Sequence, residues 1–163
     1  MATPPRIVAG TEPHLILGLD PGTEETGWAL YCPGEGISSG IEKNANMLTM
    51  IQRWEVIDPV RLAIEMISSY GMPVGREVFE TCVWIGRYKQ AWHTPDQVRL
   101  VYRKDVKLHL CGSPRAKDAN IRMALIDKLG APGTKKAQGG TYGVRSHAWA
   151  ALGVAVTANE VRA

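Results

Sequence analysis

Hydrophobic residues along the chain follow two patterns, one typical of strands and one typical of helices. The order of these patterns along the chain predicts a layered α/β fold. Near the N-terminus, short apolar runs are separated by Pro-Gly turns, which is typical of neighbouring antiparallel strands. Further along, apolar residues recur every three or four positions, as on one face of a helix. We therefore expect strands at about 14–20, 26–32, 36–41, 61–66 and 97–101, and helices at about 44–57, 77–93, 116–129 and 147–160.

These elements predict one mixed sheet of five strands flanked by helices. The first three strands form an antiparallel meander, and the next two run parallel to the first because helices act as crossovers. The helix at 147–160 begins almost wholly apolar, so it should lie against the sheet. We expect a single domain over residues 14–163 and a flexible tail at 1–13, where prolines and a glycine fall without periodicity.

Composition narrows the class of protein without choosing one. The 163 residues carry a net charge of +3, which permits a polyanionic partner but does not require one. The three cysteines form no CxxC pair, so the usual structural zinc arrangement is not expected. No apolar run approaches the roughly 20 residues of a membrane span, and no signal-peptide pattern is visible. We expect a cytoplasmic protein with no membrane partner.

Two acidic residues end predicted strands. Asp20 closes the first strand and Glu65 closes the fourth. If these strands are parallel neighbours, the two carboxylates lie together at one sheet edge, where they repel unless a cation lies between them. Paired divalent ions held in this way catalyse phosphoryl transfer. The alternative is that Glu65 is an exposed charge at a strand end.

Four motifs resemble those of RuvC-type Holliday-junction resolvases, within the RNase H-like or integrase superfamily. In order along residues 14–158 they are 16–23 (ILGLDPGT) with Gly27, 62–65 (LAIE), Ala116-Lys117 before a helix, and 146–155 (SHAWAALGVA). The first motif is shared with other RNase H-like proteins, whereas all four in order are more specific. Divergence elsewhere suggests a distant branch, for which a phage origin is one interpretation.

The resemblance implies an RNase H-like fold and a site for two Mg²⁺ or Mn²⁺ ions. It places metal ligands at Asp20, Glu65 and His147, and an acid three residues after His147, on the same helix face. That position is Ala150, whose methyl group cannot bind a metal. The resemblance also places Lys117 close to the site, where it would orient the scissile phosphate.

Ala150 has two explanations, an engineered Asp→Ala change or a natural loss of cleavage. In either case we expect weak metal binding and poor cleavage by this chain. Asp105 and Asp118 are further acids nearby, and we interpret both as helix-start residues that favour the helix dipole.

Basic and aromatic residues flank the predicted site. Lysines and arginines there would contact DNA phosphates without reading sequence; a scattered solvated surface is the alternative. An exposed aromatic or apolar residue in the loop after Glu65 would wedge between bases, unless this loop is a plain connection. The predicted DNA contacts are Tyr70, Met72, Arg103, Lys104, Lys107, Arg115, Lys117, Lys135, Lys136 and Arg145.

The helix over Glu77–Trp92 carries more apolar residues than one buried face needs, including Phe79, Val83, Trp84, Tyr88 and Trp92. This surplus predicts a homodimer through the helix, with burial under the domain's own loops as the alternative. The leading prediction is a crossover junction endonuclease acting on branched DNA. A junction-binding protein that never cuts and a YqgF-like RNA nuclease remain alternatives. An actin-like ATPase lobe is disfavoured because the chain is too short for the two lobes of that class.

Overall fold

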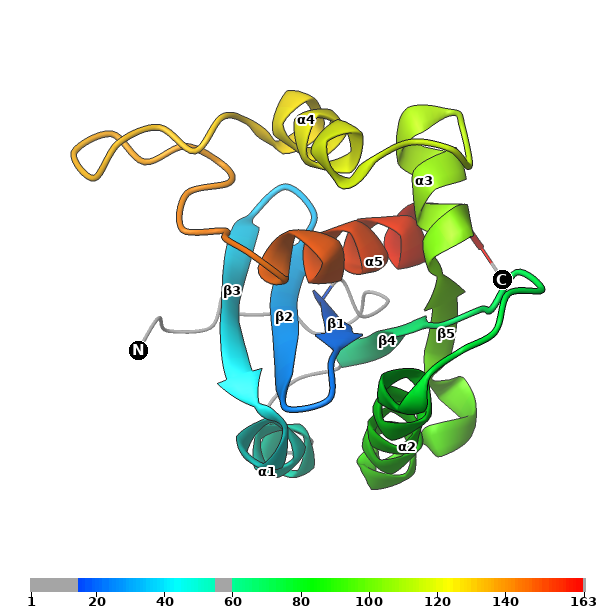
Figure 1. Cartoon of the computed structure of the whole chain (residues 1–163). Helices are drawn as coiled ribbons and strands as arrows, with labels where there is room; N and C mark the ends of the chain where they lie inside the picture. Colours follow the sequence, from blue (N-terminus) through cyan, green and yellow to red (C-terminus); the bar gives the residue numbers. More distant parts are fainter. Residues whose placement is uncertain (1–14, 55–59, 163) are drawn as a thin grey trace.

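Five strands form one mixed sheet (Figure 1). The computed structural model describes residues 15–54 and 60–162, so the predicted tail at 1–13 lies outside the described residues. The spatial order is β3-β2-β1-β4-β5, antiparallel between β1, β2 and β3 and parallel from β1 to β4 to β5. The strands are β1 (Leu15–Pro21), β2 (Glu25–Cys32), β3 (Gly36–Lys43), β4 (Val60–Met66) and β5 (Arg99–Tyr102). The predicted five-stranded RNase H-like arrangement is confirmed.

Helices cover both faces of this sheet (Figure 1). Helices α1 and α2 pack on one face, and α5, with α3 and α4 beside it, packs on the other. Their bounds are α1 (Asn44–Trp54), α2 (Arg76–Ala91), α3 (Arg103–Cys111), α4 (Asp118–Leu129) and α5 (Ala148–Glu160), with a 3₁₀ turn at Pro95–Gln97. The predicted extension of the first helix to residue 57 lies outside the described residues. The hydrophobic spacing did not predict α3, because Val106 is its one fully buried residue.

Helix α5 is the centre of the hydrophobic core on its side of the sheet. Its residues from Ala148 to Ala158 are buried except for Ala150, which is half-buried. The helix backbone rests directly on β1 at Gly18, where a Cβ atom would lie 2.2 Å from the carbonyl oxygen of Ala151. The prediction that this helix lies against the sheet is confirmed.

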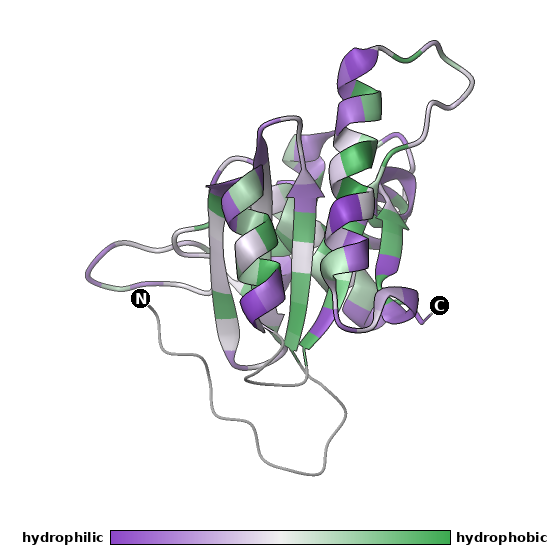
Figure 2. Ribbon diagram, turned by 90° about the horizontal axis from the view of Figure 1, so that it is seen from below, coloured by the Kyte–Doolittle hydropathy of each residue, from purple (hydrophilic) through white to green (hydrophobic). Residues whose placement is uncertain are grey.

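Helix α2 presents both a buried and an exposed apolar face. Tyr88 and Trp92 belong to the domain's own core, so they are not part of the surplus apolar surface that the sequence suggested. Phe79 and Val83 are 62% and 61% exposed. Figure 2 shows hydrophobic stretches between hydrophilic ones on the outward side of α1 and α2. Within the described residues, no helix combines the length and apolar character that a membrane crossing requires.

Candidate active site

Asp20 and Glu65 meet at one end of the sheet. The parallel register pairs Gly18 with Ala63 and Leu19 with Ile64, so the next residues, Asp20 and Glu65, lie side by side on adjacent strands. Because side chains alternate along a strand, both acids share the sheet face that α5 covers. Burial, followed by the neighbouring negative charge of Glu65, raises the pKa of Asp20 to about 8. The interpretation of Glu65 as an exposed charge is wrong, since the residue is only 8% exposed.

Arg103 joins this pair from the next strand along. Arg103 is the first residue of α3 and follows directly after β5. In β5, Val101 is paired with Glu65 of β4. The Arg103 guanidinium donates one hydrogen bond to Glu65 Oε1 at 2.9 Å and another to Asp118 at the start of α4. Burial alone would lower the pKa of Arg103, but the two carboxylates outweigh it and raise that pKa above its ordinary value.

His147 reaches the site from the N-cap position of α5. Its Nδ1 atom lies 3.2 Å from Oδ2 of Asp20. Gly27, the β2 partner of Asp20, makes this approach possible: a Cβ atom there would lie 2.5 Å from the carbonyl carbon and oxygen of His147. Ser146 precedes the turn with a left-handed φ of 48°. A glycine in one strand and a strained turn before the last helix therefore place this imidazole beside the carboxylates.

A cavity of about 370 Å³ contains most of these groups, with Ala150 at its wall. Its lining residues are Asp20, Arg103, Asp118, Ile121, Ser146, His147, Trp149 and Ala150. Position 150 therefore presents a methyl group to this cavity, and a methyl group cannot bind a metal. Asp118 begins α4 as the sequence predicted, but it also faces this cavity. No local sequence pattern indicates that second placement, because it depends on how α4 packs against α5.

The two buried carboxylates fit a divalent cation. Oxygen Oε2 of Glu65 is buried and has no hydrogen-bond partner in the part of the chain that the structure describes. Carboxylate oxygens are the ligands that Mg²⁺ prefers. Across residues 15–54 and 60–162, however, no three or more Asp, Glu, His or Cys side chains are arranged to hold an ion. A third protein ligand therefore requires a side chain to turn toward Asp20 and Glu65.

Several predicted DNA contacts gather in a neighbouring hollow. Tyr70, Arg103, Lys104, Lys107 and Pro114 line a cavity of about 390 Å³. Tyr70 is 58% exposed with a left-handed φ of 50°, and Met72 beside it is 67% exposed. Arg103 lines both cavities, so it lies between the carboxylates and this basic hollow.

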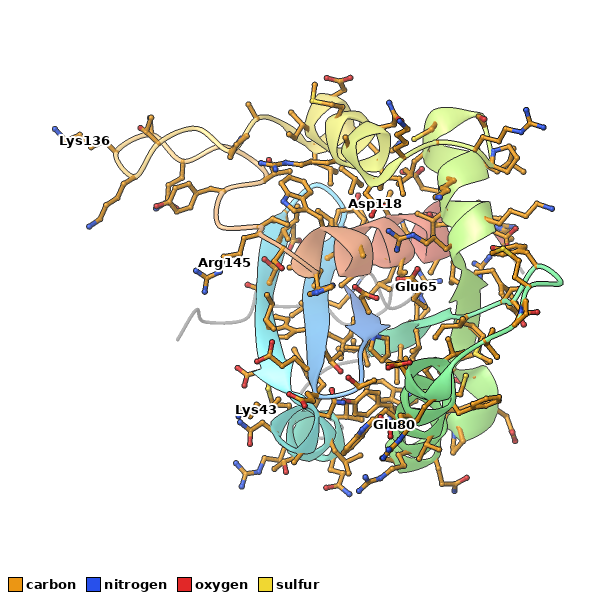
Figure 3. The ribbon with its side chains drawn as sticks, viewed as in Figure 1. Lys43, Glu65, Glu80, Asp118, Lys136 and Arg145 are labelled. Carbon is orange, nitrogen blue, oxygen red and sulfur yellow. The ribbon has the colours of Figure 1, made fainter. Side chains whose placement is uncertain are left out.

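The other predicted contacts are exposed but more widely spread. Lys117 is the N-cap of α4, next to Asp118, and is not among the described residues that line the carboxylate cavity. Arg115 lies in the connection before α4. Figure 3 shows Lys136 at the tip of a long projecting segment, and Arg145 where that segment returns, both away from Glu65. Lys135 is exposed beside Lys136.

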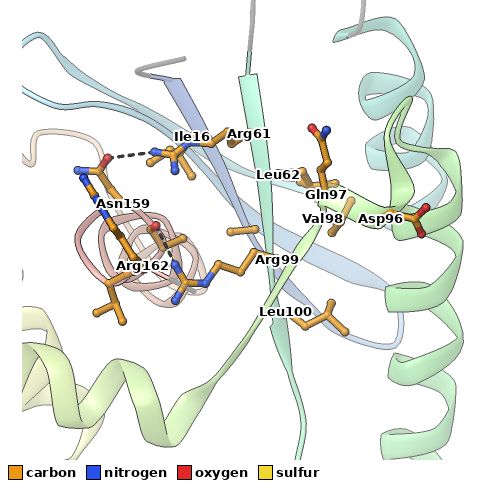
Figure 4. A pocket seen from close by; sticks show the side chains of 13 residues that line it. Ile16, Arg61, Leu62, Asp96, Gln97, Val98, Arg99, Leu100, Asn159 and Arg162 are labelled. Carbon is orange, nitrogen blue, oxygen red and sulfur yellow. Dashed lines mark hydrogen bonds between the residues drawn. The ribbon is translucent and has the colours of Figure 1, made fainter. Parts of the chain in front are cut away.

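A larger cavity, of about 890 Å³, lies at the opposite end of the strands (Figure 4). Two of its three arginines are bound to the end of α5: Arg99 donates to the carbonyl oxygen of Ala158 at 3.0 Å, and Arg61 to Oδ1 of Asn159 at 3.2 Å. Positive side chains near helix C-terminal carbonyls are stabilising. We therefore interpret this cavity as part of the helix-capping structure.

Comparisons with known proteins support the fold. The chain matches no protein-family model and no curated protein sequence. It is similar to the Thermus thermophilus RuvC structure, with a TM-score of 0.60, 18% identity, and coverage of 88% of this chain and 92% of that one. The chain has a RuvC-like fold. The same identity and coverage, with a TM-score of 0.62, relate it to T. thermophilus RuvC in complex with a Holliday junction substrate. The fold implied by the four sequence motifs is thus confirmed.

Proposed function

We propose that this chain is a structure-selective endonuclease that resolves four-way or otherwise branched DNA by metal-dependent phosphodiester hydrolysis. One observation carries the proposal: Asp20 and Glu65 lie side by side at the ends of adjacent parallel strands of a RuvC-like fold, with Glu65 buried and the Asp20 side chain 16% exposed. Two adjacent acids raise each other's pKa, so the pair lowers the stability of the folded protein. Acids with perturbed pKa values are typical of functional sites.

In this proposal Asp20, Glu65 and His147 hold two Mg²⁺ or Mn²⁺ ions. When bound, such ions activate water and stabilise the charge that develops on the phosphate. Asp20 must give up its proton to bind a cation, because its pKa is raised to about 8. His147, 3.2 Å from Asp20, is placed to accept a hydrogen bond or a proton from it at Nδ1.

DNA contacts are assigned to the basic hollow and the exposed loop beside it. Lys104 and Lys107 offer positive charge to phosphates, and Tyr70 and Met72 offer an exposed wedge for the junction. Phosphate contacts would also be made by the other exposed basic residues predicted to bind DNA, which are Arg115, Lys117, Lys135, Lys136 and Arg145. The similarity to RuvC bound to a Holliday junction supports a branched substrate.

Position 150 limits the proposed activity. The Ala150 methyl leaves the cavity without an acid on α5, so we expect poor cleavage by this chain. The test compares Mn²⁺-dependent nicking of a four-way junction by the unmodified chain and by Ala150→Asp. We expect the aspartate to raise the rate by at least about tenfold, which corresponds to roughly 1.4 kcal/mol of barrier.

Equal cleavage rates would overturn the four-ligand arrangement. If both proteins bind the junction tightly and neither cuts, the chain is a junction-binding protein instead. A structured RNA of equal length serves as the competitor, since preferential RNA cleavage would favour the YqgF-like alternative.

The proposed enzyme acts as a homodimer through α2, where Phe79 and Val83 are exposed. Two sites related by a two-fold axis suit symmetric cuts in a four-way junction. Sedimentation of Phe79→Glu should show dissociation, whereas Met123→Glu, at an exposed apolar position of α4, should not. A monomeric unmodified chain would overturn this assembly.

A further inference from the structure

Two acids from distant parts of the chain bind the same guanidinium group. Glu65 on β4 and Asp118 on α4 both accept hydrogen bonds from the Arg103 guanidinium. The two terminal nitrogens of a guanidinium are close together, so the carboxylates must converge on a single positively charged centre. Asp118 is therefore already placed beside the buried pair.

The hydrogen bonding of the Glu65 carboxylate is incomplete. The Glu65 side chain is 10% exposed, and its Oε2 atom has no hydrogen-bond partner among the described residues. A buried carboxylate oxygen without a partner is destabilising, and Arg103 satisfies only the other oxygen. The free Oε2 atom beside Asp20 is therefore available to a cation other than the guanidinium.

Asp118 and Ala150 face the same cavity from different helices. The Ala150 methyl contributes no oxygen and little volume, so space beside Asp20 and His147 stays open. The Asp118 side chain is 76% exposed, so little packing opposes its rotation. It is the one acid, besides Asp20, that lines this cavity among the residues that the structure describes.

We propose that Asp118 supplies the acidic metal ligand that position 150 lacks, and that Arg103 holds Asp118 and Glu65 until a divalent cation displaces it. The inference rests on the proposed function and names a ligand of that same site. A divalent ion attracts two carboxylates more strongly than a guanidinium does. Arg103 then remains beside Tyr70, Lys104 and Lys107, in the hollow assigned to DNA.

Titration of Mn²⁺ alone, followed by electron paramagnetic resonance, tests the proposal without a nuclease assay. Asp118→Asn should weaken Mn²⁺ binding by about tenfold or more, the scale of losing a ligand-shell group. Asp105→Asn is the matched control, because Asp105 lies in the first turn of the neighbouring helix α3 and does not line the cavity. It should change the affinity by less than about twofold.

A second comparison asks whether Asp118 replaces the acid at position 150. In the Ala150→Asp background, Asp118→Asn should cost less than about threefold in Mn²⁺ affinity, because two coupled positions are not additive. Asp118→Glu should retain most of the affinity of the unmodified chain, which separates ligation from folding. Far-ultraviolet circular dichroism confirms that each variant is folded.

The outcomes separate this inference from the proposed function. If Asp118→Asn binds Mn²⁺ as the unmodified chain does while Asp20→Asn binds it poorly, Asp118 is no ligand and the proposed function stands. A loss of equal size in both backgrounds would also overturn the replacement role. If Asp20→Asn leaves Mn²⁺ binding unchanged as well, the proposed function fails.

Discussion

Two buried polar clusters occupy opposite faces of the sheet beside the turn that joins β1 and β2, and they differ in how well their hydrogen bonds are satisfied. On the α1/α2 face, Thr26 donates to Asn44 at 2.7 Å and lies 2.8 Å from the Tyr88 hydroxyl, while Asn44 donates to the carbonyl oxygen of Gly22. On the α5 face, the acidic cluster of Asp20 and Glu65 is less well satisfied: burial raises the pKa of Asp20 to about 8, and Oε2 of Glu65 has no hydrogen-bond partner among the described residues.

The contrast separates a cluster that stabilises the fold from one that costs stability. Thr26 and Gly27 are consecutive residues of β2, so their neighbours fall on opposite faces. The neutral cluster fixes the turn after Asp20 and stabilises the fold. The acidic cluster costs stability, and perturbed acids of this kind are typical of functional sites.

The largest expected effect comes from Asp20→Asn. An amide is a poor ligand for the proposed ions, so junction cleavage by the Ala150→Asp protein should fall by about a thousandfold, or roughly 4 kcal/mol. The same change should stabilise the metal-free protein at neutral pH, because it removes one of two adjacent buried acids. Cleavage rates and urea unfolding, measured on the same samples, check both effects.

The pH dependence gives this prediction a sign. Because the folded pKa of Asp20 is raised from 3.8 to about 8, the folded state binds more protons than the unfolded state between these values. The free energy of unfolding in a chelator should therefore fall as pH rises from about 4 to 8, by on the order of a few kcal/mol. Asp20→Asn should flatten this dependence; a variant with the same slope as the unmodified chain would contradict the assignment.

Gly27→Ala should have the next largest effect, because it moves His147 away from the acidic cluster. Its Cβ atom would overlap backbone atoms of His147 at 2.5 Å, which cannot rotate away. We expect a loss of about 3 kcal/mol in unfolding free energy, together with weaker Mn²⁺ binding. Gly86→Ala is the control, since no described atom lies within 4 Å of its Cβ position; it should be neutral or slightly stabilising.

Asn44→Ala should have the smallest effect and should act on the neutral cluster alone. It leaves the Thr26 and Tyr88 hydroxyls and the Gly22 carbonyl with fewer partners. The free energy of unfolding should fall by about 2 kcal/mol, or roughly 4–8 °C in Tm for a domain of this size. Unlike the Asp20 effect, this loss should be the same at pH 5 and pH 8.

The sequence predicted those features that local pattern determines. Strand ends at Asp20 and Glu65 follow from apolar runs and turns, and a crossover helix makes their strands parallel neighbours. The structure brings His147 to 3.2 Å from Asp20, and the metal-ligand roles predicted for these residues stay a prediction.

Features that depend on packing between distant elements were not predicted. Helix α3 has too narrow a buried face to show a periodic signal. Arg103 was assigned to DNA phosphates, and the structure shows that its guanidinium is bonded to Glu65 and Asp118. That pairing depends on β5 lying beside β4 and on the position of α4. Neither arrangement can be predicted from the residues next to Arg103 in the sequence.

Helix α5 also determines when this site can exist. It follows every strand along the chain, yet it covers β1 and β2 and brings His147 to Asp20. During synthesis on a ribosome, the strands that carry Asp20 and Glu65 emerge well before the helix that covers them. A nascent chain therefore has the two acids but neither the imidazole nor the apolar cover. The site can therefore assemble only after the last helix has been synthesised and has packed on the sheet.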